Sequence, residues 1–265
     1  MSAYGIIALA SRPVDLLPPT SWDLPQPAPG KPAAPFRRLA LHHLRLDNAR
    51  ALPGPSLLDY THRIFAAEIE AGRTYPQEAG SPRDDDGAYT YTRAAFEAYF
   101  WAADVIVAVG NDAADRGGGD DNQVQAQVGT GDLLEASRAG RSWEDALVGF
   151  YYVKPNYPGR SSHICNAGFI IPPAHRDFGY GKTLGKSYLH YGPSLGYKAS
   201  VFNLVYANNT GSLRIWDSLG FTRAGLIPRA GRLRRADGSG EEWVDSVIYY
   251  RSFVDEEEWA RPIDR

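Results

Sequence analysis

The amino-acid sequence predicts a single α/β domain built around a central sheet, and three observations support that prediction. Apolar segments with strand-like spacing alternate with amphipathic helical segments from residue 36 onward. No internal repeat is visible in this part of the chain. The 265 residues are 43% hydrophobic and 22% charged, as in an ordinary soluble globular protein. We therefore assign residues 36–265 to one domain.

The first 35 residues differ in character from the rest of the chain. They contain eight prolines, which interrupt helices and remove hydrogen-bond donors from strands. We interpret residues 1–35 as an extended, proline-rich N-terminal extension. Trp22 and Leu24 are candidates to fix this extension to the domain, and a solvated linker is the alternative.

The clearest helix of the first half lies within residues 56–72. Ser56 is a favoured N-cap residue, and Gly72 stands where a left-handed C-terminal cap is expected. The helical spacing predicts a buried face made of Leu57, Tyr60, Ile64 and Ala67.

The remaining elements follow from the same kinds of pattern. Strands are predicted within residues 36–46, 104–110, 146–153, 163–172, 198–207, 223–228 and 246–253. Helices are predicted within residues 91–102, 131–140 and 210–221, and after Gly181, where one face carries Leu184, Tyr188 and Tyr191. Residues 111–131 are rich in Gly and Asp and have no period, so we interpret them as a flexible insertion. Their aspartates lack the ligand spacing of a calcium loop.

Charge, cysteine content and hydropathy exclude several classes of function. A net charge of −3 argues against a nucleic-acid-binding protein, which needs a basic face. The single cysteine, Cys165, lies in an apolar segment, which predicts a packed thiol in a reducing compartment. No apolar run approaches the ~18 residues of a membrane span, and the N-terminus lacks the basic residues of a secretory signal. We expect a cytoplasmic protein without a membrane partner, with the nucleus and the mitochondrion left open.

The segment RDFGYGK combines glycine with positive charge at the start of a helix. Glycine weakens a helix by roughly 0.5–1 kcal/mol per interior position relative to alanine, so Gly179 and Gly181 need an explanation. Without a Cβ, the N–H groups of the first turn are open to an anion, and Arg176 and Lys182 add positive charge. A plain glycine turn is the alternative. A GxGxxG dinucleotide motif is excluded, because Gly185 lies four residues beyond Gly181.

The segment NNTGSLRIWDSLGF places Ser212, Ile215, Trp216 and Leu219 on one helix face. Together with the strand and the anion-binding helix before it, this order resembles the GNAT superfamily of acyl-CoA N-acyltransferases over roughly Arg37–Phe253. The segments SHICNAGFI, SVFNLV and RIWDSLGF are similar to the fungal acetyltransferases that detoxify the proline analogue azetidine-2-carboxylate.

The resemblance implies a mixed, mostly antiparallel sheet that splays between two parallel strands, with helices on both faces. It implies acetyl-CoA as co-substrate, no metal, and direct transfer to a small amine, a proline analogue or related cyclic imino acid, in a ternary complex.

Pantetheine would lie between the strands at residues 163–171 and 199–205. The implied CoA-binding positions are Phe169, Ile170, Ile171, Arg176, Asp177, Phe178, Gly179, Tyr180, Gly181, Lys182, Asn209 and Ser212. The implied catalytic positions are Asn166, Asn203 and Asn209, and the implied substrate contacts are Tyr75, Asn166, Asn203 and Leu204.

The asparagines in the two splayed strands need polar partners. Asn166 and Asn203 interrupt apolar strands, where an unpaired buried amide costs on the order of 1–3 kcal/mol. Either the backbone at the strand gap or a ligand satisfies them, whereas Asn209 taken alone is better explained as a helix N-cap. A backbone N–H near Phe169 or Ile170 is expected to polarise the thioester carbonyl.

Two positions depart from the family pattern. Trp216 stands where many GNAT enzymes carry the tyrosine that protonates the leaving thiolate, and an indole N–H is too weak an acid for that role. No carboxylate occupies the first splayed strand, so we expect a water-relayed base, with His163, Tyr75 and Glu78 as the titratable candidates.

Two other functions stay open. A protein-lysine acetyltransferase needs an acidic groove for a basic peptide, and the aspartates of residues 111–131 could supply its charge. A CoA-binding regulator without turnover is consistent with Trp216 in place of tyrosine. From the subfamily resemblance we also expect a homodimer.

Overall fold

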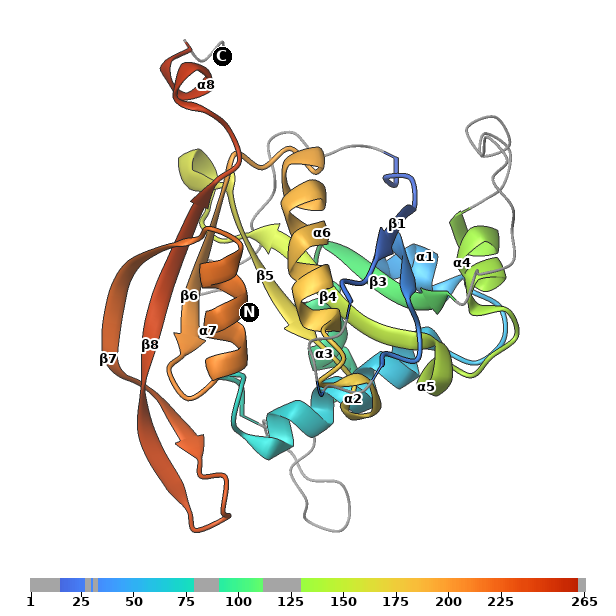
Figure 1. Ribbon diagram of the computed structural model, residues 1–265, viewed down its shortest axis with the longest axis horizontal. Helices are drawn as coiled ribbons and strands as arrows, with labels where there is room; N and C mark the ends of the chain where they lie inside the picture. The colour runs from blue at the N-terminus through green and yellow to red at the C-terminus, as the bar shows by residue number, and fades with distance from the viewer. Residues whose placement is uncertain (1–14, 27–29, 31–32, 79–90, 112–129, 262–265) are drawn as a thin grey trace.

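A mixed, eight-stranded sheet forms the centre of the protein (Figure 1). The computed structural model describes residues 15–26, 30, 33–78, 91–111 and 130–261, so most of the predicted insertion lies outside the described residues. The spatial order of the strands is β1-β2-β3-β4-β5-β6-β8-β7. Their bounds are β1 Thr20–Asp23, β2 Arg38–Leu44, β3 Asp104–Asn111, β4 Leu147–Pro155, β5 Ile164–Ile170, β6 Ala199–Tyr206, β7 Thr222–Arg234 and β8 Glu241–Ser252. Neighbouring strands are antiparallel except β5 and β6, which run parallel.

Helices cover both faces of the sheet, which confirms the predicted α/β class. Helices α6 and α7 share one apolar cluster with the sheet, and α2, α3, α4 and α5 share a second cluster on the opposite face (Figure 1). No helix among the described residues is long and apolar enough to cross a membrane. The bounds are α1 Leu46–Arg50, α2 Leu57–Ala71, α3 Arg93–Phe100, α4 Thr130–Arg138, α5 Trp143–Ala146, α6 Tyr180–Ser194, α7 Thr210–Ser218 and α8 Glu256–Ala260.

Helix α2 begins and ends where the sequence predicted. The Ser56 hydroxyl accepts a hydrogen bond from the backbone N–H of Asp59 at 3.1 Å, which satisfies one of the donors at the helix start. Gly72 follows the last helical residue with a φ of 62°, the left-handed conformation that favours glycine.

The buried face of α2 differs from the prediction. Ala67 is exposed and Ile64 is half-buried, whereas Phe65 and Ile69 are buried. The Phe65 ring lies 5.0 to 5.8 Å from five other aromatic rings, which come from the segments after α2 and from α3: Tyr75, Tyr91, Phe96, Tyr99 and Phe100. This aromatic cluster sets the rotation of α2, because burying a large ring gains more free energy than burying an alanine.

The N-terminal extension contributes an edge strand to the sheet. Strand β1 pairs with β2, and the backbone N–H of Leu17 donates to Nδ1 of His43 at 2.9 Å. The other ring nitrogen of His43 therefore carries the proton and donates to the Asp104 carboxylate at 2.8 Å. Leu24 is buried and Trp22 is half-buried. Within the described residues 15–26, the extension is therefore fixed to the domain.

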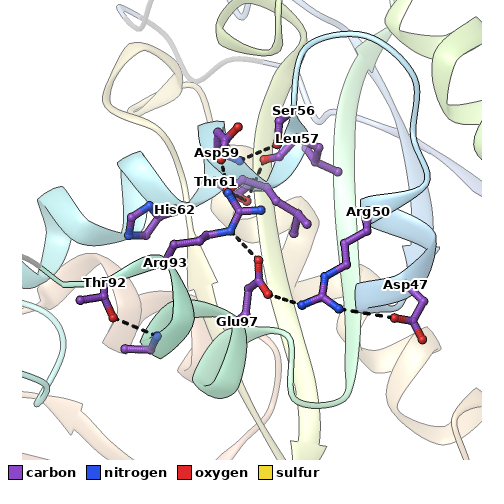
Figure 2. Close-up of polar contacts among 12 residues, drawn as sticks. Asp47, Arg50, Ser56, Leu57, Asp59, Thr61, His62, Thr92, Arg93 and Glu97 are labelled. Carbon is purple, nitrogen blue, oxygen red and sulfur yellow. Dashed lines mark hydrogen bonds and ion pairs between the residues drawn. The ribbon is translucent and has the colours of Figure 1, made fainter.

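A carboxylate joins three helices at one corner of the molecule (Figure 2). Glu97 of α3 accepts hydrogen bonds from Arg50 of α1 and from Arg93, each at 2.6 Å, and Arg93 also pairs with Asp59 of α2. Burial pushes the pKa of Glu97 upward, but the hydrogen bonds from the two guanidinium groups outweigh it and leave the pKa below its usual value. This ionic corner fixes α3 and with it the position of Tyr99.

The last two strands form a hairpin that is longer than predicted. Its far end reaches the loop after α2 (Figure 1), where the backbone N–H of Arg234 donates to the carbonyl of Gly72 at 2.8 Å. Arg232 forms an ion pair with Glu78 of the same loop at 2.7 Å. The hairpin therefore holds the loop that carries Tyr75.

The single cysteine is buried, as predicted. Cys165 on β5 has no exposed surface, and its Sγ lies 3.0 Å from the hydroxyl of Tyr188. Burial raises the pKa of this thiol to about 12, which keeps it protonated at neutral pH. Cys165 is a packed core residue.

Helices α6 and α7 approach one another closely at a glycine. A Cβ on Gly185, in the middle of α6, would lie 2.7 Å from Cδ1 of Leu219 and 3.2 Å from Cγ2 of Ile215. Glycine at this position therefore lets the two helices pack side by side. The predicted face of α6 is buried and consists of Leu184, Tyr188 and Tyr191.

We expect Gly185→Ala to lower the free energy of unfolding by about 1–3 kcal/mol, although alanine is the better helix former, because its methyl group overpacks α7. Chemical denaturation measures the effect. Gly211→Ala is the matched control: a Cβ there meets only Oδ1 of Asn209, at 3.8 Å, so this variant should be neutral or more stable. Equal stabilities of the two variants would contradict the close packing.

Candidate active site

The parallel strands β5 and β6 separate soon after they meet. Ile164 pairs with Ala199 and Cys165 pairs with Ser200, and no further pair joins these two fully described strands. The splay expected from the sequence is therefore present. It begins at Asn166, directly after the last paired residue, Cys165.

The direction of the peptide groups in β5 follows from its pairing with β4. The backbone N–H of Asn156 donates to the carbonyl of Ile164 at 2.8 Å. Because peptide groups alternate in direction along an antiparallel ladder, those of Ala167 and Phe169 point away from β4 and toward the gap. The hydroxyl of Tyr75 donates to the carbonyl of Phe169 at 3.4 Å, which agrees with that direction.

A bulge shapes the opposite side of the gap. The register of β6 against β8 shifts between Phe202 and Val205, so Asn203 and Leu204 lie outside the regular ladder. Bulges redirect side chains, and Asn203 reaches the network described below while Leu204 is exposed.

A cavity of about 670 Å³ opens at the gap. Its walls come from β5, β6, the first turns of α6 and α7, and the loop after α2. No cluster of three or more His, Cys, Asp or Glu side chains suited to a metal ion occurs in the described part of the chain. The predicted positions that line the cavity are Tyr75, Asn166, Phe169, Ile170, Ile171, Arg176, Asp177, Gly179, Tyr180, Gly181, Lys182, Asn203, Leu204, Asn209 and Ser212. Phe178 does not line it; its ring lies beside that of Tyr180, with 6.1 Å between centroids.

One end of the cavity is built from the N-terminus of α6. Gly179 precedes the helix with a φ of 88°, which explains the glycine at this position. The N–H groups of a first helical turn have no acceptor within the helix and lie at the positive end of its dipole. Gly181 lies in that turn, and Lys182 beside it is exposed. This end suits an anion with several oxygen atoms.

Arg176 already has a partner at this end. Its guanidinium group forms an ion pair with Glu68 near the end of α2, and its Nε donates to the carbonyl of Ile171 at 3.0 Å. The sequence predicted a cation directed at a ligand. The structure shows that cation bound to a carboxylate from the opposite side of the cavity, which motif spacing does not reveal.

Three tyrosines line the other end of the cavity. The hydroxyls of Tyr99 and Tyr152 lie 2.9 Å apart, and Tyr75 lies beside them. A Cβ on Gly168 would lie 2.5 Å from the Tyr152 ring and 2.7 Å from the Tyr75 hydroxyl, so only glycine allows this approach. Burial raises the pKa of all three tyrosines above the usual value, which keeps them protonated at neutral pH.

A half-buried lysine lies behind this aromatic wall. Nζ of Lys154 on β4 donates to the carbonyl of Tyr99 at 2.9 Å. It also lies 3.8 and 4.2 Å from the ring centroids of Tyr99 and Tyr152, within cation–π distance. Burial lowers the pKa of Lys154 to about 8. Nothing in the sequence distinguishes this residue, because a lysine near a strand end resembles any exposed charge.

Three asparagines meet across the strand gap. Oδ1 of Asn156, just past β4, accepts hydrogen bonds from Nδ2 of Asn166 at 2.8 Å and from Nδ2 of Asn203 at 2.6 Å. Nδ2 of Asn156 donates back to Oδ1 of Asn203 at 3.2 Å, and the Tyr157 hydroxyl donates to the same oxygen at 3.2 Å. The strand asparagines thus have the polar partner that their burial requires. That partner was missed because Asn156 lies in KPNYPG, a pattern typical of a turn.

Asn209 and Trp216 have structural partners. Oδ1 of Asn209 accepts a hydrogen bond from the backbone N–H of Ser212 at 3.1 Å, so the interpretation of Asn209 as an N-cap is confirmed. Nε1 of Trp216 donates to Oγ of Ser212 at 2.9 Å, and its ring packs against Phe202 and Phe169. Trp216 is a core residue with its N–H already paired.

Of the three candidates for a proton acceptor, only Tyr75 lines the cavity. His163 lies just before β5 with its ring against Trp259, at 5.7 Å between centroids. Glu78 is exposed and paired with Arg232. Neither side chain reaches the cavity, and the raised pKa of Tyr75 makes it a poor base at neutral pH.

Comparison with known proteins places this cavity in a family context. The acetyltransferase (GNAT) family model matches residues 130–221, which include β4 to α7. The chain is 38% identical to N-acetyltransferase aca1 of Schizosaccharomyces pombe over 186 residues, 70% of this chain and 75% of that protein. Its fold is similar to a GCN5-related N-acetyltransferase from Kribbella flavida, with a TM-score of 0.51, 20% identity, and 81% and 97% of the two chains covered. It is also similar to yncA of Salmonella typhimurium, solved with acetyl-CoA, with a TM-score of 0.51, 15% identity, and 82% and 95% covered.

We expect the half-buried Lys154 to make stability depend on pH. Between its folded pKa of about 8 and the ordinary value of 10.5, the unfolded chain binds the proton and the folded chain does not. Raising the pH through this window should therefore stabilise the native protein relative to Lys154→Met by on the order of 1–3 kcal/mol. Urea denaturation at about pH 7 and about pH 10 measures this change, with the exposed Lys186→Met as control. A difference that does not change with pH would contradict the burial of the ammonium group.

Proposed function

The chain belongs to the GNAT family of acetyltransferases, and we propose that it transfers the acetyl group of acetyl-CoA directly to a small amine in a ternary complex. The acceptor we propose is a proline analogue or a related cyclic imino acid, as in the fungal acetyltransferases that the sequence resembles. The observation that carries the proposal is one cavity at a strand gap, with a helix N-terminus at one end and amides and tyrosines at the other. We expect the working form to be a cytoplasmic homodimer.

The residues at the α6 end fit the co-substrate. When bound, acetyl-CoA supplies the acetyl group as an activated thioester. The first-turn N–H groups after Gly179, together with Lys182, would hold its pyrophosphate, since an anion at a helix N-terminus meets unpaired donors. The peptide groups of Ala167 and Phe169 would pair with the pantetheine arm, because no strand partner meets them in the gap.

Backbone and amide groups near the gap can orient the reacting atoms. Phe169, rather than Ile170, directs its peptide N–H into the gap, so it is the donor placed to polarise a carbonyl oxygen there. Asn166 lines the cavity and can orient the attacking nitrogen. Holding both substrates in this geometry supplies much of the rate, because it replaces an encounter in solution with a fixed approach.

Proton transfer in this cavity depends on water. The paired N–H of Trp216 is unsuited to protonating the leaving thiolate, and the buried tyrosines are poor bases. Glu68 lines the cavity but is paired with Arg176. We therefore propose that water carries the amine proton away from the acceptor end.

The charge around the acceptor end favours an amine that carries a carboxylate. The side-chain amine of Lys154 is partly protonated and lies behind Tyr99 and Tyr152. No carboxylate pairs with it among the described residues. A basic peptide, which a protein-lysine acetyltransferase must bind, would meet positive charge here. A small imino acid is the better match.

We expect Gly181→Asp to abolish acetyl-CoA binding while the fold survives. The new side chain would approach Cδ1 of Ile215, 3.2 Å from the Cβ position, and would place negative charge where the pyrophosphate binds. Titration calorimetry with acetyl-CoA measures the loss. Ser194→Asp, which adds one charge at the opposite end of the same helix, should bind normally. Unchanged affinity in Gly181→Asp would overturn the assignment of this site.

An acceptor series tests the reaction itself. Release of CoA thiol from acetyl-CoA should be rapid with azetidine-2-carboxylate or hydroxyproline, and at least tenfold slower with azetidine, which lacks the carboxylate. Mass spectrometry identifies the N-acetyl product. Faster transfer to a lysine peptide would support a protein acetyltransferase instead. Tight acetyl-CoA binding without turnover on any acceptor would support a regulator.

A further inference from the structure

We propose that Asn156 is a positioning residue that holds Asn166 and Asn203 in one fixed orientation across the gap between β5 and β6. The inference rests on the proposed function, because Asn156 does not line the cavity and acts on the reaction only through the other two amides. It adds a residue to the site that neither the motifs nor the resemblance assigns.

The backbone of Asn156 is held in place from several sides. Its N–H donates to the carbonyl of Ile164 at 2.8 Å, beside the first residue pair of β5 and β6. Pro155 before it and Pro158 after it restrict the local backbone dihedrals. Only 9% of Asn156 is exposed. The side chain is therefore anchored where the two parallel strands begin to separate.

The Asn156 amide uses both of its polar ends. Its oxygen accepts from two NH₂ groups, those of Asn166 and Asn203, and its own NH₂ group donates back to Asn203. Rotating the Asn156 amide by half a turn would exchange its oxygen and its NH₂ group. Its NH₂ group would then face the NH₂ groups of Asn166 and Asn203. Because an unpaired buried amide costs on the order of 1–3 kcal/mol, the three side chains are locked as a set.

The network determines which atom of Asn166 is left for a ligand. Nδ2 of Asn166 is committed to Asn156, and its Oδ1 is buried without a partner among the described residues. Asn166 therefore offers a hydrogen-bond acceptor, which can receive the N–H of an acceptor amine and cannot bind a carboxylate. Without Asn156, the side-chain amide of Asn166 is free to rotate, and its oxygen is no longer the atom held toward the ligand.

A double-mutant cycle tests the role in catalysis. We expect Asn156→Ala to lower kcat/KM for the amine by about 10- to 100-fold, because misplacement by about 1 Å costs that much, with acetyl-CoA affinity unchanged. Asn166→Ala should lower it at least as far. Adding Asn156→Ala to the variant that already carries both Asn166→Ala and Asn203→Ala should then change the rate by less than about threefold, because both groups that Asn156 positions are gone. If the effects of the substitutions on kcat/KM multiply, or if Asn156→Ala keeps the native kcat/KM, the proposal is overturned.

Asn48→Ala is the matched control for the cycle. Oδ1 of Asn48 accepts a hydrogen bond from the backbone N–H of Arg45 at 3.2 Å, and Asn48 lies outside the cavity. This variant loses an exposed hydrogen bond to an asparagine side chain far from the strand gap and should keep native kinetics. A comparable loss of rate in Asn48→Ala would show that the effect of Asn156→Ala is general destabilisation.

A readout that needs no turnover separates this proposal from the proposed function. Nitrogen-edited NMR should show slow hydrogen exchange at the side-chain NH₂ groups of Asn166 and Asn203, and fast exchange in Asn156→Ala. Asn156→Asp, which keeps the accepting oxygen, serves if the alanine variant does not fold, and should retain slow exchange at Asn166. Unchanged exchange at both amides in Asn156→Ala, or fast exchange at Asn166 in Asn156→Asp, overturns the positioning role, whether or not an acceptor is acetylated.

Discussion

The early loss of backbone pairing between β5 and β6 is the constraint on which the rest of the site depends. Two parallel strands in a sheet interior normally pair along their length, and each unpaired buried peptide group costs free energy. Here side chains partly replace the missing ladder. The hydroxyl of Tyr75 pairs with the carbonyl of Phe169, and three amides bridge the strands where they begin to diverge. The gap thus remains open in a densely packed protein.

Two glycines allow large groups to surround this gap without closing it. Gly185 lets α6 and α7 pack so closely that both helices begin at the same cavity, and Gly168 admits the tyrosines on the opposite face of the sheet. The ionic corner around Glu97 holds α3, and the β7–β8 hairpin holds the loop after α2. The acceptor end is therefore assembled from segments that are far apart in the chain and fixed independently.

Local patterns were predictable from the sequence, and long-range partners were not. The caps of α2 and the glycine turn before α6 depend on neighbouring residues, and each was placed correctly, whereas the parallel strand pair was implied by the resemblance. The rotation of α2 depends on rings of which four lie more than twenty residues from Phe65, and Ala67 was wrongly expected inside. The ion pair of Arg176 with Glu68 and the hydrogen bonds of Asn156 join distant segments, so no spacing rule indicates them. The resemblance supplied positions, but not the partners that orient them.

The burial of Cys165 has a practical and a chemical consequence. The chain has one cysteine, and its protonated thiol has no exposed surface. Peroxide and disulfide reagents attack exposed thiolates, so this enzyme should keep working in an oxidising cell that inactivates thiol-dependent enzymes. For the same reason a thiol-reactive dye, added to the folded protein, detects the sulfur of released CoA without a background from the protein itself.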